Sequence, residues 1–419
     1  MNDHIPALRK TFREAYENEL SSFYKDLYVS KGFLPQKSFP KDLEAWKKLP
    51  FLENNDIRKY PLFQRVFTPW EKVISIRYSS GTSGRGLTLT PRTEAEDVRP
   101  AIIPYYWTSG HMNRLLNFFH STAGRIHLLF PEVAHLEADF EDLPSTARLA
   151  TIFKPDCLYA TPSALEKFSP LFLKNSDPLS ISLIVICGEL LHPKQFSYLR
   201  NTFPKALITG DLSMTQVGRF GYPCEQLWKH GLNLYHPAKD ILWELESTDK
   251  NVESNNTHIG EIVLTKLTEG AAMPLLRYKT GDCARKVKTP CSCRTETYEL
   301  LGRVEIDYVD IKGGGRLWLG ELERALLIHA KEVEDYQLRV KGKLDSEVLK
   351  MELAVLPRRK VNLANLVRNI EEDIKISPEM SLGEAVRARL CSPLTCVLMG
   401  PERIVENDRK KLRIVRTEI

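Results

Sequence analysis

The chain has 419 residues, 42% hydrophobic and 27% charged, a composition typical of a globular protein with a sizeable core. At roughly 150 residues per domain this length predicts two or three domains, and one large domain with one small domain fits it. The net charge of +5 is spread thinly, which argues against a polybasic nucleic-acid binder, and eight cysteines are too few for a disulfide-stapled fold. The chain has no run of 18 apolar residues, and its start lacks the apolar centre of a signal peptide. We therefore expect a cytoplasmic protein that does not bind membranes.

Residues 1–70 show helical periodicity and proline-marked turns, which predicts a helical approach to a sheet. From residue 73 onward, short β-rich runs alternate with helical runs, which predicts an α/β domain with parallel strands. The β-rich runs are 73–79, 125–130, 156–162, 183–188 and 206–211.

Between residues 241 and 312 the pattern changes to strands joined by turns, which predicts a β-rich subdomain. The run Gly313–Gly315 then allows large backbone excursions and predicts a hinge or domain boundary. Beyond it, a hairpin over 332–357, a helix over 362–375 and a further strand predict α+β structure. The sequence thus predicts an α/β fold with a large domain over 1–312 and a small mobile α+β domain over 313–419.

The segment Tyr78–Gly86, with the sequence YSSGTSGRG, carries the clearest chemical signal. Its hydroxyl groups and glycines follow a predicted strand, and such a loop can wrap backbone N–H and side-chain O–H groups around phosphate oxygens. The Walker pattern is absent, which argues against an ordinary P-loop. A flexible solvated loop is the alternative interpretation.

This loop resembles the phosphate-binding loop [ST]SGTTGxP of the adenylate-forming enzymes, and in particular that of the phenylacetate–CoA ligases. Four further segments resemble family motifs in the same order and spacing: PDCLYATPS at 155–163, CGE at 187–189, LSMTQVG at 212–218 and GEIVLTKLTEGAAMPLLRYKTGD at 260–282. Gly302–Arg303 and the later Gly314 and Glu321–Glu323 resemble the family's hinge region. The resemblance covers roughly residues 73–325, and the terminal α+β part resembles the family's small mobile domain.

The resemblance implies ATP and Mg²⁺ as cofactors and assigns ATP-binding roles to residues of these motifs. They are Ser79, Ser80, Gly81, Thr82, Ser83, Gly84, Arg85, Gly188, Glu189, Leu212, Gln216, Asp282 and Arg303. Thr215 is expected to be catalytic, because its hydroxyl can donate to a phosphoryl oxygen. The Asp282 carboxylate can accept from both ribose hydroxyls, and Arg303 offers a fixed fork of donors. A strand-capping aspartate and a surface ion pair are the respective alternatives.

Several positions depart from the family pattern. Gln216 replaces a glutamate that binds Mg²⁺, and an amide oxygen is a weaker, neutral ligand. Arg85 and Gly86 replace a lysine and a proline of the phosphate loop, while Leu212 replaces an aromatic residue that stacks on adenine. These departures leave open a non-catalytic relative that binds a nucleotide or an acyl group.

The end of the chain, DRKKLRIVR at 408–416, resembles the family's terminal GKxxR motif. Lys410 matches the catalytic lysine of that motif when Arg413 takes the place of the arginine, and Lys411 is the alternative shifted by one residue. A solvated basic terminus would explain the same residues.

A metal site is a further hypothesis. Cys291 and Cys293 resemble the CxCGRT segment of some phenylacetate–CoA ligases, which is paired there with an earlier cysteine and histidine. The matching residues here are Cys224 and His230, with His236 as a second candidate histidine. Three thiolates and an imidazole suit a structural Zn²⁺, whereas buried free thiols are the alternative.

The resemblance implies a ligase that activates a small carboxylic acid to an acyl-adenylate and passes the acyl group to a thiol, which we expect to be that of CoA. A carrier-protein thiol, a protein or an amine are alternative acceptors. Phe118, Phe119 and His120 are candidates for the wall of the acid pocket, although core packing would also explain the two aromatic residues. Neither a nucleic acid nor a membrane is expected as a partner, and a homodimer is left open.

Overall fold

The structure is a computed structural model of the whole chain. It describes residues 4–36, 39–79, 88–97, 112–118, 133–139, 141–224, 226–246, 259–267, 269–304, 307–311, 315–329, 333–341, 350–357, 360, 362–377, 380–400, 406–407, 410–411 and 413–417.

Short helices form the N-terminal approach, as predicted. They are α1 (Ile5–Tyr16), α2 (Phe23–Ser30), α3 (Leu43–Lys47), α4 (Asn54–Lys59), η2 (Leu62–Arg65) and η3 (Trp70–Lys72). In α1 the apolar residues Leu8, Phe12 and Ala15 recur at helical spacing and are buried, because they share one face of the helix. This face joins a large apolar core that also contains Ile262 and Leu264, so the helices pack against the main sheet.

An 11-stranded sheet connects most of the large N-terminal part. Its parallel half consists of β3 (Arg114–Asn117), β4 (Ala134–Glu137), β5 (Cys157–Ala160), β6 (Leu183–Cys187) and β7 (Leu207–Met214). Its antiparallel half consists of β8 (Gly218–Tyr222), β9 (Leu234–Pro237), β10 (Ile241–Glu246), β11 (Ile259–Lys266), β12 (Tyr278–Val287) and β13 (Thr297–Arg303). The strand order is β10-β11-β12-β13-β9-β8-β7-β6-β5-β3-β4.

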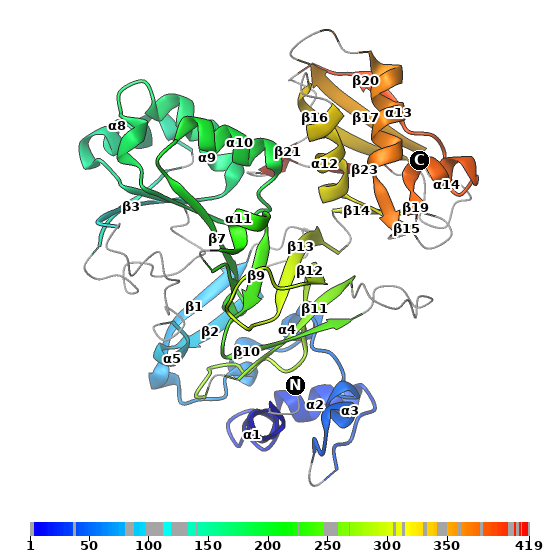
Figure 1. Cartoon of the computed structure of the whole chain (residues 1–419). Helices are drawn as coiled ribbons and strands as arrows, with labels where there is room; N and C mark the ends of the chain where they lie inside the picture. Colours follow the sequence, from blue (N-terminus) through cyan, green and yellow to red (C-terminus); the bar gives the residue numbers. More distant parts are fainter. Residues whose placement is uncertain are drawn as a thin grey trace.

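Three helices cover one face of the parallel half: α8 (Leu143–Phe153), α9 (Pro162–Phe172) and α10 (Pro193–Thr202) (Figure 1). Their apolar residues form one core with inward-facing residues of β5, β6 and β7. Among the described residues of the antiparallel half, the short α11 (Leu227–His230) is the only helix, so the predicted change from α/β to β-rich structure is confirmed.

One described element differs from its prediction, and the β-rich run predicted over 125–130 lies outside the described residues. Strand β1 (Val73–Ser79) was expected among the parallel strands, but it pairs antiparallel with β2 (Thr88–Thr93) in a separate two-stranded sheet. Helix α5 (Glu94–Asp97) follows β2 directly. The chain turns back after only eight residues, and so short a connection favours an antiparallel pair over a parallel crossover.

The C-terminal part has its own core and its own sheets. Its elements are β14 (Tyr308–Ile311), β15 (Gly315–Trp318), α12 (Leu319–His329), β16 (Val333–Lys341), β17 (Lys350–Pro357), α13 (Leu363–Asp373), β18 (Lys375–Ser377), β19 (Met380–Ser381), α14 (Leu382–Arg387), β20 (Thr395–Leu398), β21 (Glu406–Asn407), β22 (Lys410–Lys411) and β23 (Ile414–Thr417). Strands β20, β17, β16 and β23 form a four-stranded sheet, and the predicted hairpin over 332–357 is its β16–β17 pair.

The boundary expected after residue 312 falls inside a hairpin. Strand β14 pairs antiparallel with β15, and Val309 and Ile311 of β14 are buried in the C-terminal core with Leu317. Packing therefore groups β14 with the C-terminal part, which Figure 1 shows as a separate body beside the large part. Among the described residues, no helix is long and apolar enough to cross a membrane.

Gly210 of β7 tests how tightly the two halves of the sheet are packed. A Cβ atom built on it would lie 2.4 Å from Cζ2 of Trp228 and 2.7 Å from the hydroxyl of Tyr235. We expect Gly210→Ala to lower the free energy of unfolding by roughly 1–3 kcal/mol, because the partly buried Trp228 ring and the buried Tyr235 ring must move. Urea unfolding measures this change. The matched control is Gly320→Ala in α12, where a Cβ meets nothing within 4 Å; there we expect a gain of up to about 1 kcal/mol. The same change in the free energy of unfolding in both variants would contradict the packing argument.

Candidate functional site

Three of the sequence motifs lie at one edge of the sheet. Strands β5, β6 and β7 are neighbours and parallel, so their carboxyl ends meet at the same edge. The segments that leave these ends are Thr161–Ser163, Gly188–Glu189 and Thr215–Gln216. Ligands of open α/β sheets bind outside the carboxyl ends of the strands. This edge is therefore the candidate site.

The Glu189 carboxylate links two of these segments. Its Oε2 accepts a hydrogen bond from the backbone N–H of Ser163, at 3.3 Å. Its Oε1 is buried and has no hydrogen-bond partner among the described residues. A buried carboxylate oxygen without a donor costs about 1–3 kcal/mol or more, which makes it a natural acceptor for an N–H group of a ligand.

The turn between β7 and β8 carries Thr215 and Gln216. The carbonyl of Thr215 accepts a hydrogen bond from Nη2 of Arg92, at 2.8 Å, and Gln216 is buried. Leu212, at the end of β7, is also buried and packs in the apolar core of the sheet. The sequence predicts an adenine contact for Leu212, and the core packing limits any such contact to the edge of its side chain.

Asp282 and Arg303 come together because β12 and β13 pair in the register that places them opposite each other. Nε of Arg303 lies 3.1 Å from Oδ1 of Asp282, and this partner raises the pKa of the guanidinium. Asp307 accepts from the backbone N–H of Arg303, at 2.8 Å, and burial raises the pKa of its carboxyl. The Arg303 side chain is 41% exposed, so it can reach a ligand without leaving Asp282.

The C-terminal part touches the large part next to the Gly188–Glu189 turn. His192 lies in the same loop, and its Nδ1 is 3.9 Å from Oε1 of the buried Glu323 of α12. Nearby, Lys194 donates to the carbonyl of Val333. The candidate site is thus bordered by both parts of the chain.

Arg413, which matches the arginine of the terminal motif, is held in the C-terminal core. It pairs with Asp335, donates to the carbonyl of Tyr336 at 3.0 Å and stacks its guanidinium over the Tyr336 ring, with 4.9 Å to the centroid. Lys410 lies in β22, which pairs antiparallel with β21. The anchor at Arg413 therefore fixes the chain three residues from Lys410.

Most of the remaining predicted site residues are not described by the structure. Residues Ser80, Gly81, Thr82, Ser83, Gly84 and Arg85 of the loop lie outside the described residues, as do Phe119 and His120; Ser79 is the last residue of β1. Phe118 is 2% exposed and packs edge-on against Phe168 of α9, with 5.1 Å between ring centroids. Core packing is therefore the interpretation that holds for Phe118.

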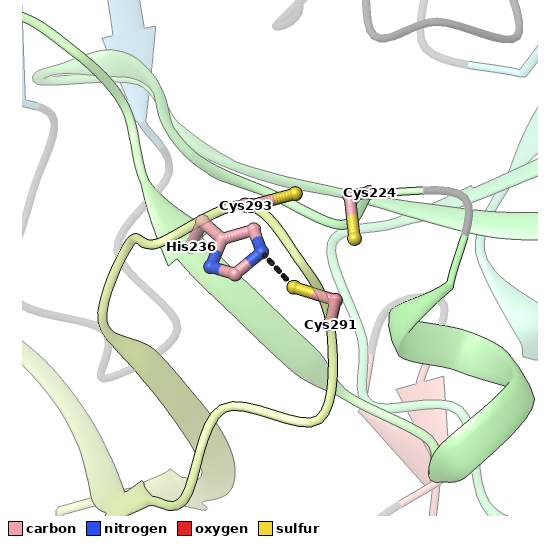
Figure 2. A group of neighbouring side chains, drawn as sticks. All are labelled: Cys224, His236, Cys291 and Cys293. Carbon is pink, nitrogen blue, oxygen red and sulfur yellow. Dashed lines mark hydrogen bonds between the residues drawn. The ribbon is translucent and has the colours of Figure 1, made fainter.

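The structure brings the three predicted cysteine ligands together, but with His236 and not with His230. Cys224, Cys291 and Cys293 come together with His236, and the four ligand atoms lie within 4.8 Å of one another (Figure 2). His230 was the first choice for the histidine, but it ends helix α11 and is outside this group. His236 lies on β9 beside the β12–β13 loop, so strand pairing and not sequence spacing selects it.

The geometry of this group suits a tetrahedral ion. Ligands about 2.3 Å from Zn²⁺ lie about 3.8 Å apart, so only small shifts would bring these four atoms onto one ion. Nδ1 of His236 is 2.9 Å from the carbonyl of Glu296, and its Nε2 is 3.3 Å from Sγ of Cys291. Hydrogen bonding of Nδ1 to a carbonyl leaves Nε2 as the metal-binding atom, as in many metal sites.

Sequence reasoning missed the charged residues that hold the β7–β8 turn: Arg92, Glu96 and Lys266. Each is buried, and Arg92 contacts the turn directly. One signal for them is visible in the sequence, because Lys266 interrupts the apolar run of β11. A buried lysine needs a partner, but the sequence alone does not say which one.

Comparisons with known proteins agree with this architecture. A scan against models of protein families matches none of them. The chain is 25% identical to a phenylacetate–coenzyme A ligase of Aromatoleum evansii over an alignment of 441 residues, covering 97% of this chain and 94% of the relative. It is 27% identical to a phenylacetate–coenzyme A ligase of Thermus thermophilus over 369 residues, covering 81% of this chain and 79% of the relative.

Among solved structures, a 2-hydroxyisobutyryl–CoA ligase in its postadenylation state with an acyl-AMP matches with a TM-score of 0.75 and 16% identity. The match covers 99% of this chain and 88% of that chain. The same ligase with 2-hydroxyisobutyryl-AMP and CoA, in its thioesterification state, matches with a TM-score of 0.60 and 17% identity, covering 99% and 89%.

The fold is therefore that of the adenylate-forming enzymes, as the motifs predicted. The predicted resemblance to the phenylacetate–CoA ligases is also confirmed, since the chain is similar to two of them over most of its length.

Proposed function

We propose that this protein is an AMP-forming acid–CoA ligase. It converts a carboxylic acid and ATP to an acyl-adenylate and pyrophosphate, and then transfers the acyl group to the thiol of CoA. The observation that carries this proposal is the extent of the similarity, since 97% of this chain aligns with 94% of a phenylacetate–coenzyme A ligase. The large part and the C-terminal part are thus both present.

The residues assigned to ATP binding include the kinds of group that adenylation needs. In the first step the acid's carboxylate attacks the α-phosphorus of ATP, and catalysis consists mainly of positioning and charge stabilisation. Loop residues 79–85 hold the phosphates, and the Thr215 hydroxyl donates to a phosphoryl oxygen. Asp282 accepts from the ribose hydroxyls while Arg303 stays paired with it. The unpaired Oε1 of Glu189 accepts from an N–H group of the nucleotide.

In the second step the thiol of CoA must reach the acyl-adenylate that Lys410 helped to form. We place the hinge at the start of β14, near Asp307, so that the C-terminal part with β14 can rotate, remove Lys410 and admit the thiol. Beside the site the two parts meet through polar contacts, among them His192 with Glu323 and Lys194 with Val333, and a small apolar cluster of Cys283, Leu301, Tyr308 and Trp318 also joins them. Polar contacts of this kind can be exchanged at low cost, as expected for a movable domain interface.

A panel of carboxylic acids, assayed for pyrophosphate release with and without CoA, tests the proposal. Small aromatic and short acyl acids form the first panel, and acyl-CoA is measured by chromatography. Thioester formation that depends on CoA supports the ligase. Adenylate formation without use of CoA would indicate a carrier protein, another protein or an amine as the acceptor. ATP binding without pyrophosphate release for any acid would overturn the proposal in favour of a non-catalytic relative.

Lys410→Ala should slow adenylation about a hundredfold or more, because a cation that stabilises charge in the transition state is lost. Reaction of preformed acyl-adenylate with CoA should remain close to that of the unchanged protein, since Lys410 is expected to leave the site for that step. ATP–pyrophosphate exchange and single-turnover thioester formation measure the two steps. Lys411→Ala is the matched control, and a loss of exchange only in that variant would shift the motif by one residue.

Gln216→Glu should tighten Mg·ATP binding and raise the adenylation rate. A glutamate offers a full negative charge to Mg²⁺, whereas the amide of Gln216 offers only a dipole. Exchange rates over a Mg²⁺ titration measure this effect. A lower rate in the variant would mean that the buried glutamine has a role of its own, such as hydrogen bonding to the acid or the acceptor.

We also propose a structural Zn²⁺ held by Cys224, His236, Cys291 and Cys293. The ion would tie the end of β8, strand β9 and the β12–β13 loop together, and metal binding would add to folding energy. Protein purified without chelator should contain about one equivalent of zinc. Cys291→Ser and Cys293→Ser should lose the metal and unfold at lower temperature, whereas Cys396→Ser on β20 should keep it. If the native protein contains no zinc and the cysteine variants are as stable as it is, the zinc proposal is wrong and the three cysteines are ordinary free thiols.

A further inference from the structure

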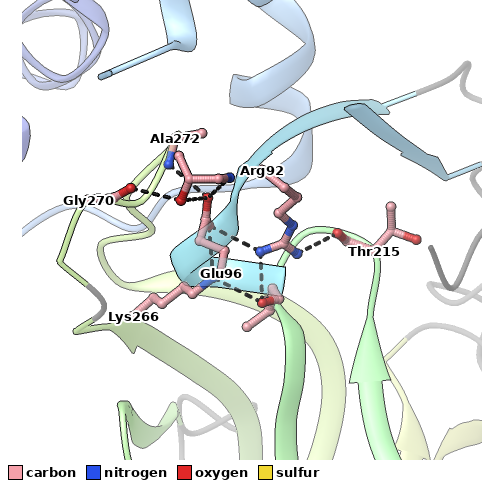
Figure 3. Close-up of polar contacts among 8 residues, drawn as sticks. Arg92, Glu96, Thr215, Lys266, Gly270 and Ala272 are labelled. Atoms are coloured by element: carbon pink, nitrogen blue, oxygen red, sulfur yellow. Dashed lines mark hydrogen bonds and ion pairs between the residues drawn. The ribbon is translucent and has the colours of Figure 1, made fainter. Parts of the chain in front are cut away.

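A compact group of three charged side chains lies beneath the β7–β8 turn (Figure 3). Oε1 of Glu96 accepts from Nη1 of Arg92 at 3.2 Å and from Nζ of Lys266 at 2.9 Å. All three side chains are 1% exposed. The residues come from β2, α5 and β11, so three segments distant in sequence meet here. We call this group the Arg92–Glu96–Lys266 triad.

Both cations of the triad also bind the backbone of the turn. Arg92 donates to the carbonyl of Thr215 at 2.8 Å and to that of Val217 at 3.0 Å. Lys266 donates to the same Val217 carbonyl at 3.3 Å. The two carbonyls flank Gln216, so the triad fixes the backbone on both sides of that residue.

The carboxylate end of the triad holds two other segments. Oε2 of Glu96 accepts from the backbone N–H of Thr93, at 3.0 Å, and from that of Ala272, at 2.8 Å. Thr93 ends β2, the strand that follows the 79–85 loop, and Ala272 lies in the segment that leads to Asp282. The triad therefore links the turn to β2 and to the 260–282 motif segment.

Stability alone is a weak reason for such a group. Burying charges costs solvation energy, and replacing a buried ion pair by apolar residues is often neutral or even stabilising. Burial alone would raise the pKa of Glu96, but Lys266 and Arg92 hold it at about 2, so the carboxylate stays charged. What the charges provide and apolar residues cannot is directed hydrogen bonding to the turn's carbonyls.

We propose that Arg92, Glu96 and Lys266 are positioning residues for adenylation, which hold the Thr215–Val217 turn against β2 and the segment that leads to Asp282. This inference rests on the proposed ligase function. The three residues are not proposed to touch the nucleotide. They act through the backbone that carries Thr215 and Gln216. Small displacements of groups that act in the transition state reduce the turnover number more than they reduce substrate binding.

Two variants test the triad without leaving an unpaired buried charge. Arg92→Lys keeps the charge but loses the fork that reaches both carbonyls and Glu96 together. Lys266→Met removes one cation and leaves a neutral Arg92–Glu96 pair. The matched control is Glu244→Gln on β10, whose carboxylate pairs with the buried Arg277 at 3.1 Å, away from the turn. Each variant is assayed for ATP–pyrophosphate exchange and for thermal unfolding.

Arg92→Lys should lower kcat of exchange about 10- to 100-fold, with KM for ATP changed less than about threefold. Lys266→Met should lower kcat less, about 3- to 10-fold. Lys266→Arg should keep most of the kcat of the unchanged protein, because arginine again donates to the Val217 carbonyl. Glu244→Gln should lower the unfolding temperature without changing kcat. If Arg92→Lys and Lys266→Met keep kcat within about twofold while their unfolding temperatures fall like that of the control, the triad is only structural and the inference is overturned.

Failure of the proposed function would give a different result. If the unchanged protein shows no exchange with any acid, the proposed function itself is wrong, and the inference, which rests on it, is overturned with it. If the unchanged protein and Glu244→Gln exchange normally, the kcat of the triad variants tests the inference alone.

Discussion

The candidate site depends on the pairing of strand β7, which is parallel to β6 on one side and antiparallel to β8 on the other. Parallel neighbours bring the loops after β5 and β6 to the carboxyl edge of the sheet. The antiparallel neighbour forces the chain to reverse within the few residues between Met214 and Gly218. The tight turn that results carries Thr215 and Gln216 to the same edge as Glu189, so the change of strand direction itself assembles the site.

Charged groups around this edge fall into two kinds. The Arg92–Glu96–Lys266 triad is fully buried and bonded to backbone on several sides, so moving it requires breaking directed bonds in a low-dielectric interior. The Asp282–Arg303 pair is partly exposed, and water screens it. Arg303 can therefore reach a ligand at low cost, whereas the β7–β8 turn stays fixed. The proposed function, in which a nucleotide binds and products leave, needs both properties.

The C-terminal part shows the same division between fixed and exchangeable contacts. Its core is separate from the cores of the large part, and Arg413 is locked into it by Asp335 and Tyr336. Against the large part it makes polar contacts, such as that between His192 and Glu323, and one small apolar contact of Tyr308 and Trp318 with Cys283 and Leu301. A large apolar interface would resist separation, whereas polar contacts can be replaced by water and a small apolar cluster costs less to open. The C-terminal part can thus move as one body while the end of the chain keeps its place in that body.

The sequence by itself determined the order of elements, the α/β class and the motif segments, because hydrophobic periodicity and local residue chemistry are encoded within short windows. It also determined the resemblance to the adenylate-forming enzymes. It could not decide that β1 pairs with β2 and not with the parallel strands, or that His236 and not His230 joins the three cysteines. Nor could it reveal that Lys266 lies against Glu96, 170 positions earlier in the chain. Strand pairing and long-range packing decide these matters, since the partners of a buried charge or of a metal ligand depend on which distant segments the fold brings together.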